Sequence, residues 1–185
     1  MSDPMSDPAR YHPLQVVLHW LSAVLVIFAW IIGAIVFERI PTTETAQKIF
    51  ALRGHMTAGL LIAFIVTLRL ALRFSLDQPP RATSGNAKLD RLALAVHYAL
   101  YVAVFGMAAS GLTLAVQAGL PAIVFGNSDA PLPANFWDFP PRAVHAVIGT
   151  ILISLVALHG VAALYHQFVR KDGLLRRMWF SGPTG

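Results

Sequence analysis

Histidines are the residues of this 185-residue chain best suited to chemistry, because several of its seven lie within or beside long apolar segments. An ionisable side chain in such a segment is costly and usually has a function. The chain has no cysteine, which excludes thiolate-bound haem, iron–sulfur clusters, c-type haem and disulfides. A lone histidine is as often a strut between helices as a metal ligand, so the spacing of several must decide.

The spacing of His145 and His159 is the most informative. They are fourteen residues apart, which in an α-helix is about 1400° of rotation, so their side chains lie within about 40° on one face. Along the helix axis they are about 21 Å apart. One helix would therefore offer two imidazoles at two depths.

The composition places these residues in a lipid bilayer. The chain is 56% hydrophobic and 12% charged, with a mean hydropathy of +0.62, outside the range of soluble domains. Four apolar segments, about residues 14–37, 54–72, 91–117 and 142–169, are long enough to cross a hydrocarbon core of about 30 Å. We therefore expect an all-α fold, in which residues 1–185 form one membrane domain built as a four-helix bundle.

The basic residues predict the orientation of this bundle. The net charge of +5 does not indicate nucleic-acid binding here, because the basic residues flank the apolar segments, as membrane topology requires. Both termini are expected to be cytoplasmic, and the proline-rich segment 118–141 is expected to be a loop on the outer membrane surface. Ten basic residues lie on the cytoplasmic side (Arg10, Arg69, Arg73, Arg81, Lys88, Arg91, Arg170, Lys171, Arg176 and Arg177) and four on the outer side (Arg39, Lys48, Arg53 and Arg142).

This orientation pairs the histidines by depth. His55 and His145 fall near the outer surface and are called the outer pair; His19 and His159 fall near the cytoplasmic side and are called the inner pair. A six-coordinate haem needs axial nitrogens on opposite faces of its ring, which facing helices can supply. The spacing therefore predicts two stacked b-type haems that conduct electrons across the membrane.

Glycines accompany these histidines. Gly59 follows His55 by four residues, Gly149 follows His145 by four, and Gly33 lies fourteen residues beyond His19. Each would place a residue without a side chain on the histidine's own helix face, where a porphyrin edge could lie against the helix. Small residues also pack transmembrane helices in general, so each glycine alone is weak evidence.

Two further histidines have open roles. His97, in the third helix, could replace His19 as a ligand, donate a hydrogen bond to a ligand or stabilise the bundle. His166 lies near the cytoplasmic boundary, where an imidazole of pKa near 6.5 could pass protons to a bound quinone. An exposed interfacial histidine is the alternative for His166.

Three basic residues lie near the outer pair. Arg53, Lys48 and Arg142 are close in sequence to His55 or His145. They could pair with haem propionates or attract a small anion to the outer haem. The alternative is ordinary extension of a cationic side chain toward the membrane surface.

These residues also resemble a known family. The segment from Tyr11 to Trp20, the segment from Gly54 to Gly59 with Arg69 following, and the interval from His145 through His159 to Lys171-Asp172 are similar to the prokaryotic di-haem cytochrome b-561 family. The likeness covers about residues 10–180. Residue by residue, the family's four haem ligands match the outer and inner pairs, and His166 matches a histidine near the family's proposed quinone site.

The resemblance implies a multi-pass protein of the bacterial inner membrane that exchanges electrons with ubiquinone. Some members are superoxide oxidases, which oxidise superoxide on the periplasmic side and pass the electron to ubiquinone, and the short loops favour this activity. Others are membrane anchors of a partner dehydrogenase or hydrogenase, which is the second hypothesis. A third, of another class, is a haem-free cation transporter, which the scarcity of carboxylates within the apolar segments disfavours.

Overall fold

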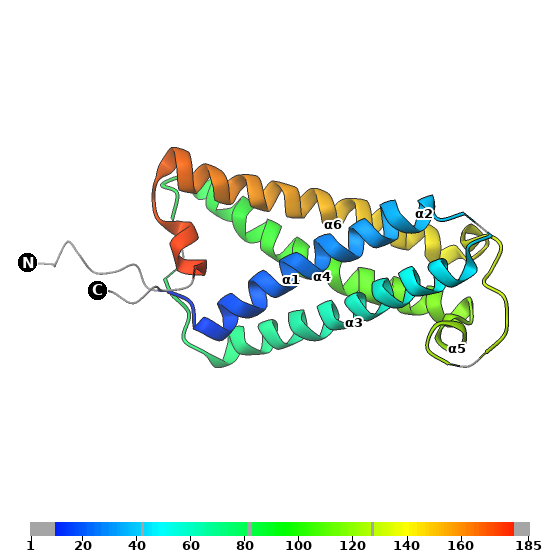
Figure 1. Cartoon of the computed structure of the whole chain (residues 1–185). Helices are drawn as coiled ribbons and strands as arrows, with labels where there is room; N and C mark the ends of the chain where they lie inside the picture. The colour runs from blue at the N-terminus through cyan, green and yellow to red at the C-terminus, as the bar shows by residue number, and fades with distance from the viewer. Residues whose placement is uncertain (1–9, 42, 81–82, 127, 180–185) are drawn as a thin grey trace, which may run out of the picture.

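Four long helices make up most of the chain. The computed structural model describes residues 10–41, 43–80, 83–126 and 128–179, and these residues contain helices and no strands. Four helical spans are long and apolar enough to cross a membrane, which confirms the predicted all-α membrane bundle. They run antiparallel along one long axis (Figure 1). The spans are Pro13–Arg39, Thr45–Ser75, Ala87–Gln117 and Pro140–Arg170.

The first and last spans are not uniform α-helices. Helix α1 (Pro13–Ile31) continues through a π-helical segment, Ile32–Val36, into the short α2 (Phe37–Arg39). Helix α6 (Pro140–Tyr165) likewise continues into a π-helical segment, His166–Arg170. Such wide turns rotate the following side chains relative to a regular helix and are frequent at functional sites.

The two middle spans begin earlier than their apolar segments. Helix α3 (Thr45–Ser75) begins nine residues before the expected boundary at residue 54, and α4 (Ala87–Gln117) begins four residues before residue 91. The side chain of Asn86 caps α4 by accepting a hydrogen bond from the Lys88 amide at 2.9 Å. Both helices therefore extend beyond their apolar segments. The Asn86 cap marks the start of α4, whereas α3 starts without a side-chain cap hydrogen bond.

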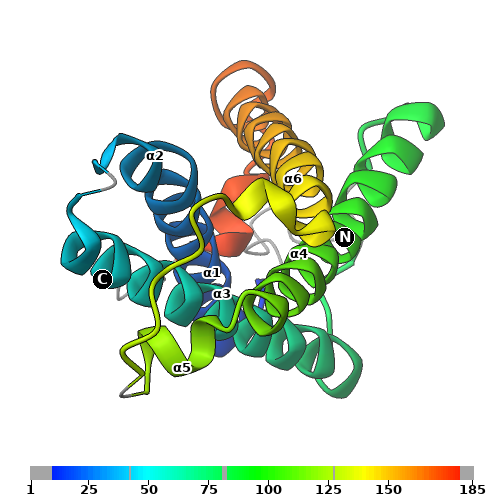
Figure 2. The same ribbon diagram turned by 90° about the vertical axis from the view of Figure 1, so that its right-hand side faces the viewer.

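The bundle consists of two helix pairs. Helix α1 packs along α3, α4 packs along α6, and contacts between α3 and α4 join the pairs (Figure 2). Several residues at the centre are small, which lets the helices approach closely. The central cluster is formed by Ala29, Ala58, Ile62, Val66, Ala103, Val104 and Leu152. Leu152 is the only buried residue of α6, so this helix has much surface free for lipid and for a cofactor.

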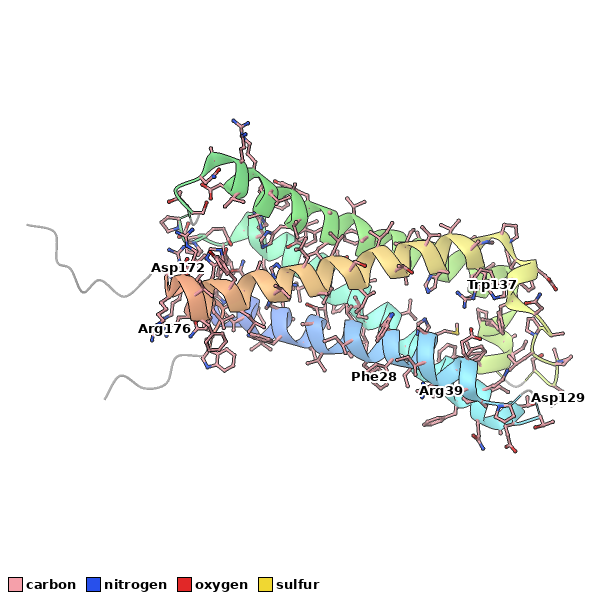
Figure 3. The ribbon with its side chains drawn as sticks, turned by 90° about the horizontal axis from the view of Figure 1, so that it is seen from above. Phe28, Arg39, Asp129, Trp137, Asp172 and Arg176 are labelled. Carbon is pink, nitrogen blue, oxygen red and sulfur yellow. The ribbon has the colours of Figure 1, made fainter. Side chains whose placement is uncertain are left out.

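The connection after α4 closes one end of the bundle. Gly119, with φ of +66°, ends α4 and starts the short α5 (Leu120–Val124), which packs with the ends of α3 and α4. A 3₁₀ turn, Phe136–Asp138, precedes α6. Trp137 and Arg39 lie at this end, far from Asp172 and Arg176 at the other (Figure 3).

The first and last described residues meet at the opposite end. A 3₁₀ helix, Leu174–Met178, folds back so that the Trp20 indole donates to the Met178 carbonyl at 2.7 Å. The Tyr11 amide donates to the Arg177 carbonyl at 3.2 Å. These bonds fix the beginning of α1 beside the C-terminal segment.

Candidate functional site

The outer pair is brought together across the two helix pairs. His55 comes from α3 and His145 from α6, and their ring centroids are 6.0 Å apart with planes inclined by 74°. His55 Nδ1 donates to the Ala29 carbonyl at 2.9 Å. This bond assigns the proton to Nδ1 and leaves the Nε2 lone pair of His55 available to a metal.

The tautomer of His145 follows from a neighbouring hydroxyl. Ser110 Oγ lies 3.0 Å from His145 Nδ1 and also donates to the Met107 carbonyl at 3.1 Å. Because the hydroxyl has one proton, which goes to Met107, Nδ1 of His145 must be the donor to Ser110. Both histidines of the outer pair therefore have Nε2 free as a ligand.

The inner pair repeats this geometry about four helical turns away along α6. His19 of α1 and His159 of α6 have ring centroids 6.2 Å apart and planes inclined by 72°. The Arg69 guanidinium of α3 lies beside them, and its nitrogen is 2.9 Å from His19 Nδ1. Arginine can only donate, so Nδ1 of His19 accepts here and the ring proton is on Nε2. That proton must leave, or Arg69 must release Nδ1, before Nε2 of His19 can bind a metal.

Comparison with known proteins identifies the family of the chain that contains these two pairs. A sequence model of the prokaryotic cytochrome b561 family matches residues 10–181. The chain belongs to this family. It is 30% identical to cytochrome b561 homolog 2 of Escherichia coli K12 over 94% of this chain and 93% of the relative. It is 30% identical to cytochrome b562 of Cereibacter sphaeroides over 94% and 98%. It is 25% identical to the probable superoxide oxidase CybB of Yersinia pestis over 91% and 95%.

Family membership confirms several expectations made from the sequence. Cytochromes b561 of this family are multi-pass proteins of the bacterial inner membrane that transfer electrons with haem b. The chain is therefore an electron-transfer protein of the oxidoreductase type. A haem-free transporter is not supported.

The histidine pairs of this cytochrome b561 fit haem iron. Two imidazole nitrogens bound to one metal at about 2 Å each place the ring centroids about 6 Å apart, as in both pairs. Among the described residues, no group of three or more His, Cys, Asp or Glu side chains could hold a metal ion. Two facing imidazoles without further ligands suit a metal whose other four positions are filled by a porphyrin.

Glycines lie behind both rings of the outer pair. A Cβ added at Gly33 would lie 2.7 Å from His55 Cε1, and one at Gly111 would lie 3.0 Å from His145 Cε1. Gly33 is in the π-helical segment and lies against His55, a neighbour that sequence reasoning, which placed it on the helix face of His19, did not name. Sequence reasoning missed Gly111. The small pair Ser110-Gly111 in an otherwise apolar helix was the available signal.

Gly59 and Gly149 do not lie against a histidine ring. A Cβ at Gly59 would meet nothing within 4 Å, which leaves space for the edge of a flat cofactor. A Cβ at Gly149 would have ordinary contact with Met107 at 3.5 Å. Their role beside haem stays a prediction.

The inner pair has polar neighbours that the outer pair lacks. His97 lies with its ring centroid 5.1 Å from that of His159, and its Nδ1 donates to the Ala93 carbonyl at 2.6 Å. Gln15, four residues before His19, is only 6% exposed, and its buried Oε1 has no hydrogen-bond partner among the described residues. Sequence reasoning assigned no role to Gln15. It used Arg69 only for membrane orientation and in the family resemblance, although a cation within an apolar helix is itself a signal of a site.

The three basic residues at the α5 end have internal partners. Arg53 donates through two nitrogens to the Val124 carbonyl at 2.9 and 2.7 Å, and so fixes α5. Arg142 contacts Glu38 at 3.3 Å and lies 4.6 Å from the Trp137 ring centroid. Lys48 Nζ lies 5.1 Å from the Phe37 ring centroid.

His166 is tied to an acid at the opposite end. Its Nδ1 contacts the Asp172 carboxylate, which also contacts Arg170 at 3.4 Å. Burial acts to raise the pKa of the Asp172 carboxyl, but hydrogen bonds from His166 and the Leu174 amide and the charge of Arg170 outweigh it and lower that pKa below its usual range.

Proposed function

We propose that this cytochrome b561 holds two b haems, one on each histidine pair, and passes electrons from periplasmic superoxide to ubiquinone. The observation that supports this is the presence of two matched imidazole pairs at two depths of one bundle, both using α6. Haem b, when bound, supplies a one-electron carrier. Two such carriers would connect the two membrane surfaces.

The basic residues support an orientation with both termini in the cytoplasm. The end with the described termini has most of the lysines and arginines, and the α5 end has Arg39, Lys48, Arg53 and Arg142. Arg81, one of the ten residues counted for the cytoplasmic side, lies outside the described residues. The outer pair then lies toward the periplasm and the inner pair toward the cytoplasm.

At the periplasmic end, cationic side chains would attract an anionic donor. Lys48 and Arg142 suit this role better than Arg53, because both Arg53 contacts go to the Val124 carbonyl. Arg142 also has an acidic partner, Glu38, whose side chain is 56% exposed. The name of the Yersinia pestis relative, a probable superoxide oxidase, supports superoxide as that donor.

At the cytoplasmic end, quinone reduction needs protons. In the overall reaction, two superoxide anions lose one electron each and become two dioxygen molecules, while one ubiquinone takes up two electrons and two protons and becomes ubiquinol. His166 and Asp172 form a pair that can hold and pass a proton at this surface. We therefore assign them to the ubiquinone side.

The test is superoxide consumption by the purified protein. With an enzymatic superoxide source and a short-chain ubiquinone, superoxide loss should require both the protein and the quinone, with ubiquinol formed at half the rate. The rate should fall with rising salt, and Lys48→Gln and Arg142→Gln should weaken that salt dependence. The matched control is Arg39→Gln, a basic residue of the same end with no role in the proposal.

Superoxide loss that is independent of quinone would overturn the proposal. A dehydrogenase that co-purifies with the protein and reduces it would instead indicate the membrane-anchor hypothesis. A salt-independent rate would remove the steering role of Lys48 and Arg142 and leave the electron path intact.

A further inference from the structure

Arg69 is a cation held within the membrane beside the inner pair. One of its terminal nitrogens lies 2.9 Å from His19 Nδ1, and the other donates to Ser22 Oγ at 2.9 Å. Ser22, which is 5% exposed, donates in turn to the His19 carbonyl at 2.8 Å. The guanidinium is therefore fixed against both the ring and the backbone of His19.

No acid neutralises this charge in the described structure. The four spans contain only Glu38 and Asp90 as acidic residues, both near helix ends. None of the ion pairs found among the described residues includes Arg69. Its nearest polar partners, Ser22 and His19, are uncharged or basic, and Tyr101 of α4 is the phenol within electrostatic range. The inner pair thus lies beside a full positive charge.

The outer pair has neutral partners at the equivalent positions. His55 Nδ1 is bonded to the Ala29 carbonyl, and His145 Nδ1 to Ser110. The nearest cations of that end, Arg53 and Arg142, contact the Val124 carbonyl and Glu38 respectively. Arg142 acts electrostatically on both outer histidines but is paired with Glu38, whereas Arg69 lies at hydrogen-bond distance from an inner histidine and has no acidic partner in the described structure. The two sites therefore share their ring geometry but differ in the cation beside them.

We propose that Arg69 is a positioning residue that makes the inner haem easier to reduce than the outer haem. Reduction removes one positive charge from the iron, so a fixed neighbouring cation favours the reduced state, and strongly where water is excluded. This inference rests on the proposed di-haem function. The proposed difference in potential gives electron transfer a direction, because electrons arriving at the outer pair would move to the higher potential of the inner pair and then to the quinone.

The experiment is an optical redox titration of the detergent-purified holoprotein. Arg69→Gln, which keeps hydrogen-bond donors and removes the charge, should lower one of the two midpoint potentials and leave the other unchanged. We expect at least a tenfold shift of the electron equilibrium between the haems, which is about 59 mV for one electron. Arg69→Lys should restore most of the potential, because it restores the charge.

The matched control is Arg73→Gln, one turn further along α3, where the side chain has no contact with a histidine of either pair in the described structure. Because Arg73 acts on this region only through its charge on Arg69, the variant should shift both potentials less than Arg69→Gln shifts one. Equal shifts in Arg69→Gln and Arg73→Gln, or unchanged potentials in Arg69→Gln with normal haem spectra, would overturn the inference. So would a rise in potential in Arg69→Gln.

Single-site proteins test the same inference if Arg69→Gln does not accumulate. His55→Ala should leave a haem whose potential matches the higher wild-type value, and His19→Ala should leave one that matches the lower value. The reverse assignment would overturn the role of Arg69. A wild-type protein with fewer than two haems would contradict the proposed function itself, so the two failures are distinguishable.

Discussion

The outer and inner histidine pairs have nearly the same geometry and different surroundings. Their centroid distances are 6.0 and 6.2 Å, but the outer rings lie against glycines and neutral hydrogen-bond acceptors, whereas the inner rings lie among Arg69 and His97. The helix packing sets the distance between the two rings at both sites. The second layer of residues gives each site its own properties, as is general for metal centres.

The largest expected effect comes from removing a ligand at either site. His145→Ala and His159→Ala should each reduce haem content from about two to about one per chain, because a haem held by one imidazole is lost more readily. His97→Ala and His12→Ala should keep both haems, because neither residue belongs to a pair. Haem extraction and quantification against protein concentration measures this, and loss of haem in His97→Ala would make His97 a ligand.

The next largest effect is expected on haem affinity, from substituting a glycine behind the outer pair. Gly33→Ala would place a Cβ 2.7 Å from His55 Cε1, so the ring must move and haem affinity of the outer site should fall about tenfold or more. The matched control is Gly54→Ala on α3, where a Cβ meets nothing within 4 Å. Haem transfer to apomyoglobin measures the affinity, and equal behaviour of the two variants would disprove the close-contact argument.

A smaller effect is expected from the hydroxyl bonded to His145. Ser110→Ala removes the acceptor of the Nδ1 proton of His145, which makes the imidazole a weaker electron donor. The reduction potential of the outer haem should therefore rise by less than about 59 mV, which is a less than tenfold change in the equilibrium constant. Thr113→Val, which removes a hydroxyl bonded only to the Ala109 carbonyl, is the control. A redox titration in which the inner potential moved instead would reverse the assignment of the two sites.

The smallest effect concerns Asp172 at the inner end. Its lowered pKa means that the folded state holds the ionised carboxylate, so this stabilisation is present above the unfolded pKa of about 3.9 and is lost as pH falls through the folded value. Asp172→Asn should lower the melting temperature at neutral pH by at most about 3 °C and remove that part of the acid dependence. Thermal loss of the haem absorbance at pH 7 and at pH 3 compares the two proteins.

Much of the fold could be predicted because the bilayer restricts what a chain can do. Four uninterrupted apolar segments leave four spanning helices as the simplest solution, since every backbone polar group must be bonded within the membrane. The helix ends were less predictable. Helix α3 begins at Thr45 because amphipathic turns continue beyond the hydrocarbon, and hydropathy does not detect them.

The sequence by itself determined the four spans, the supply of histidines and their two depths, because helical periodicity converts residue number directly into height and face. Only the tertiary structure decided which groups surround each ligand. Gly111, Ser110 and Arg69 reach their histidines from other helices, and Gly33 reaches His55 from a π-helical segment. Such contacts depend on helix rotation and local helix geometry, which the local sequence pattern does not encode. The difference between two sites with equal ligands therefore arises from packing.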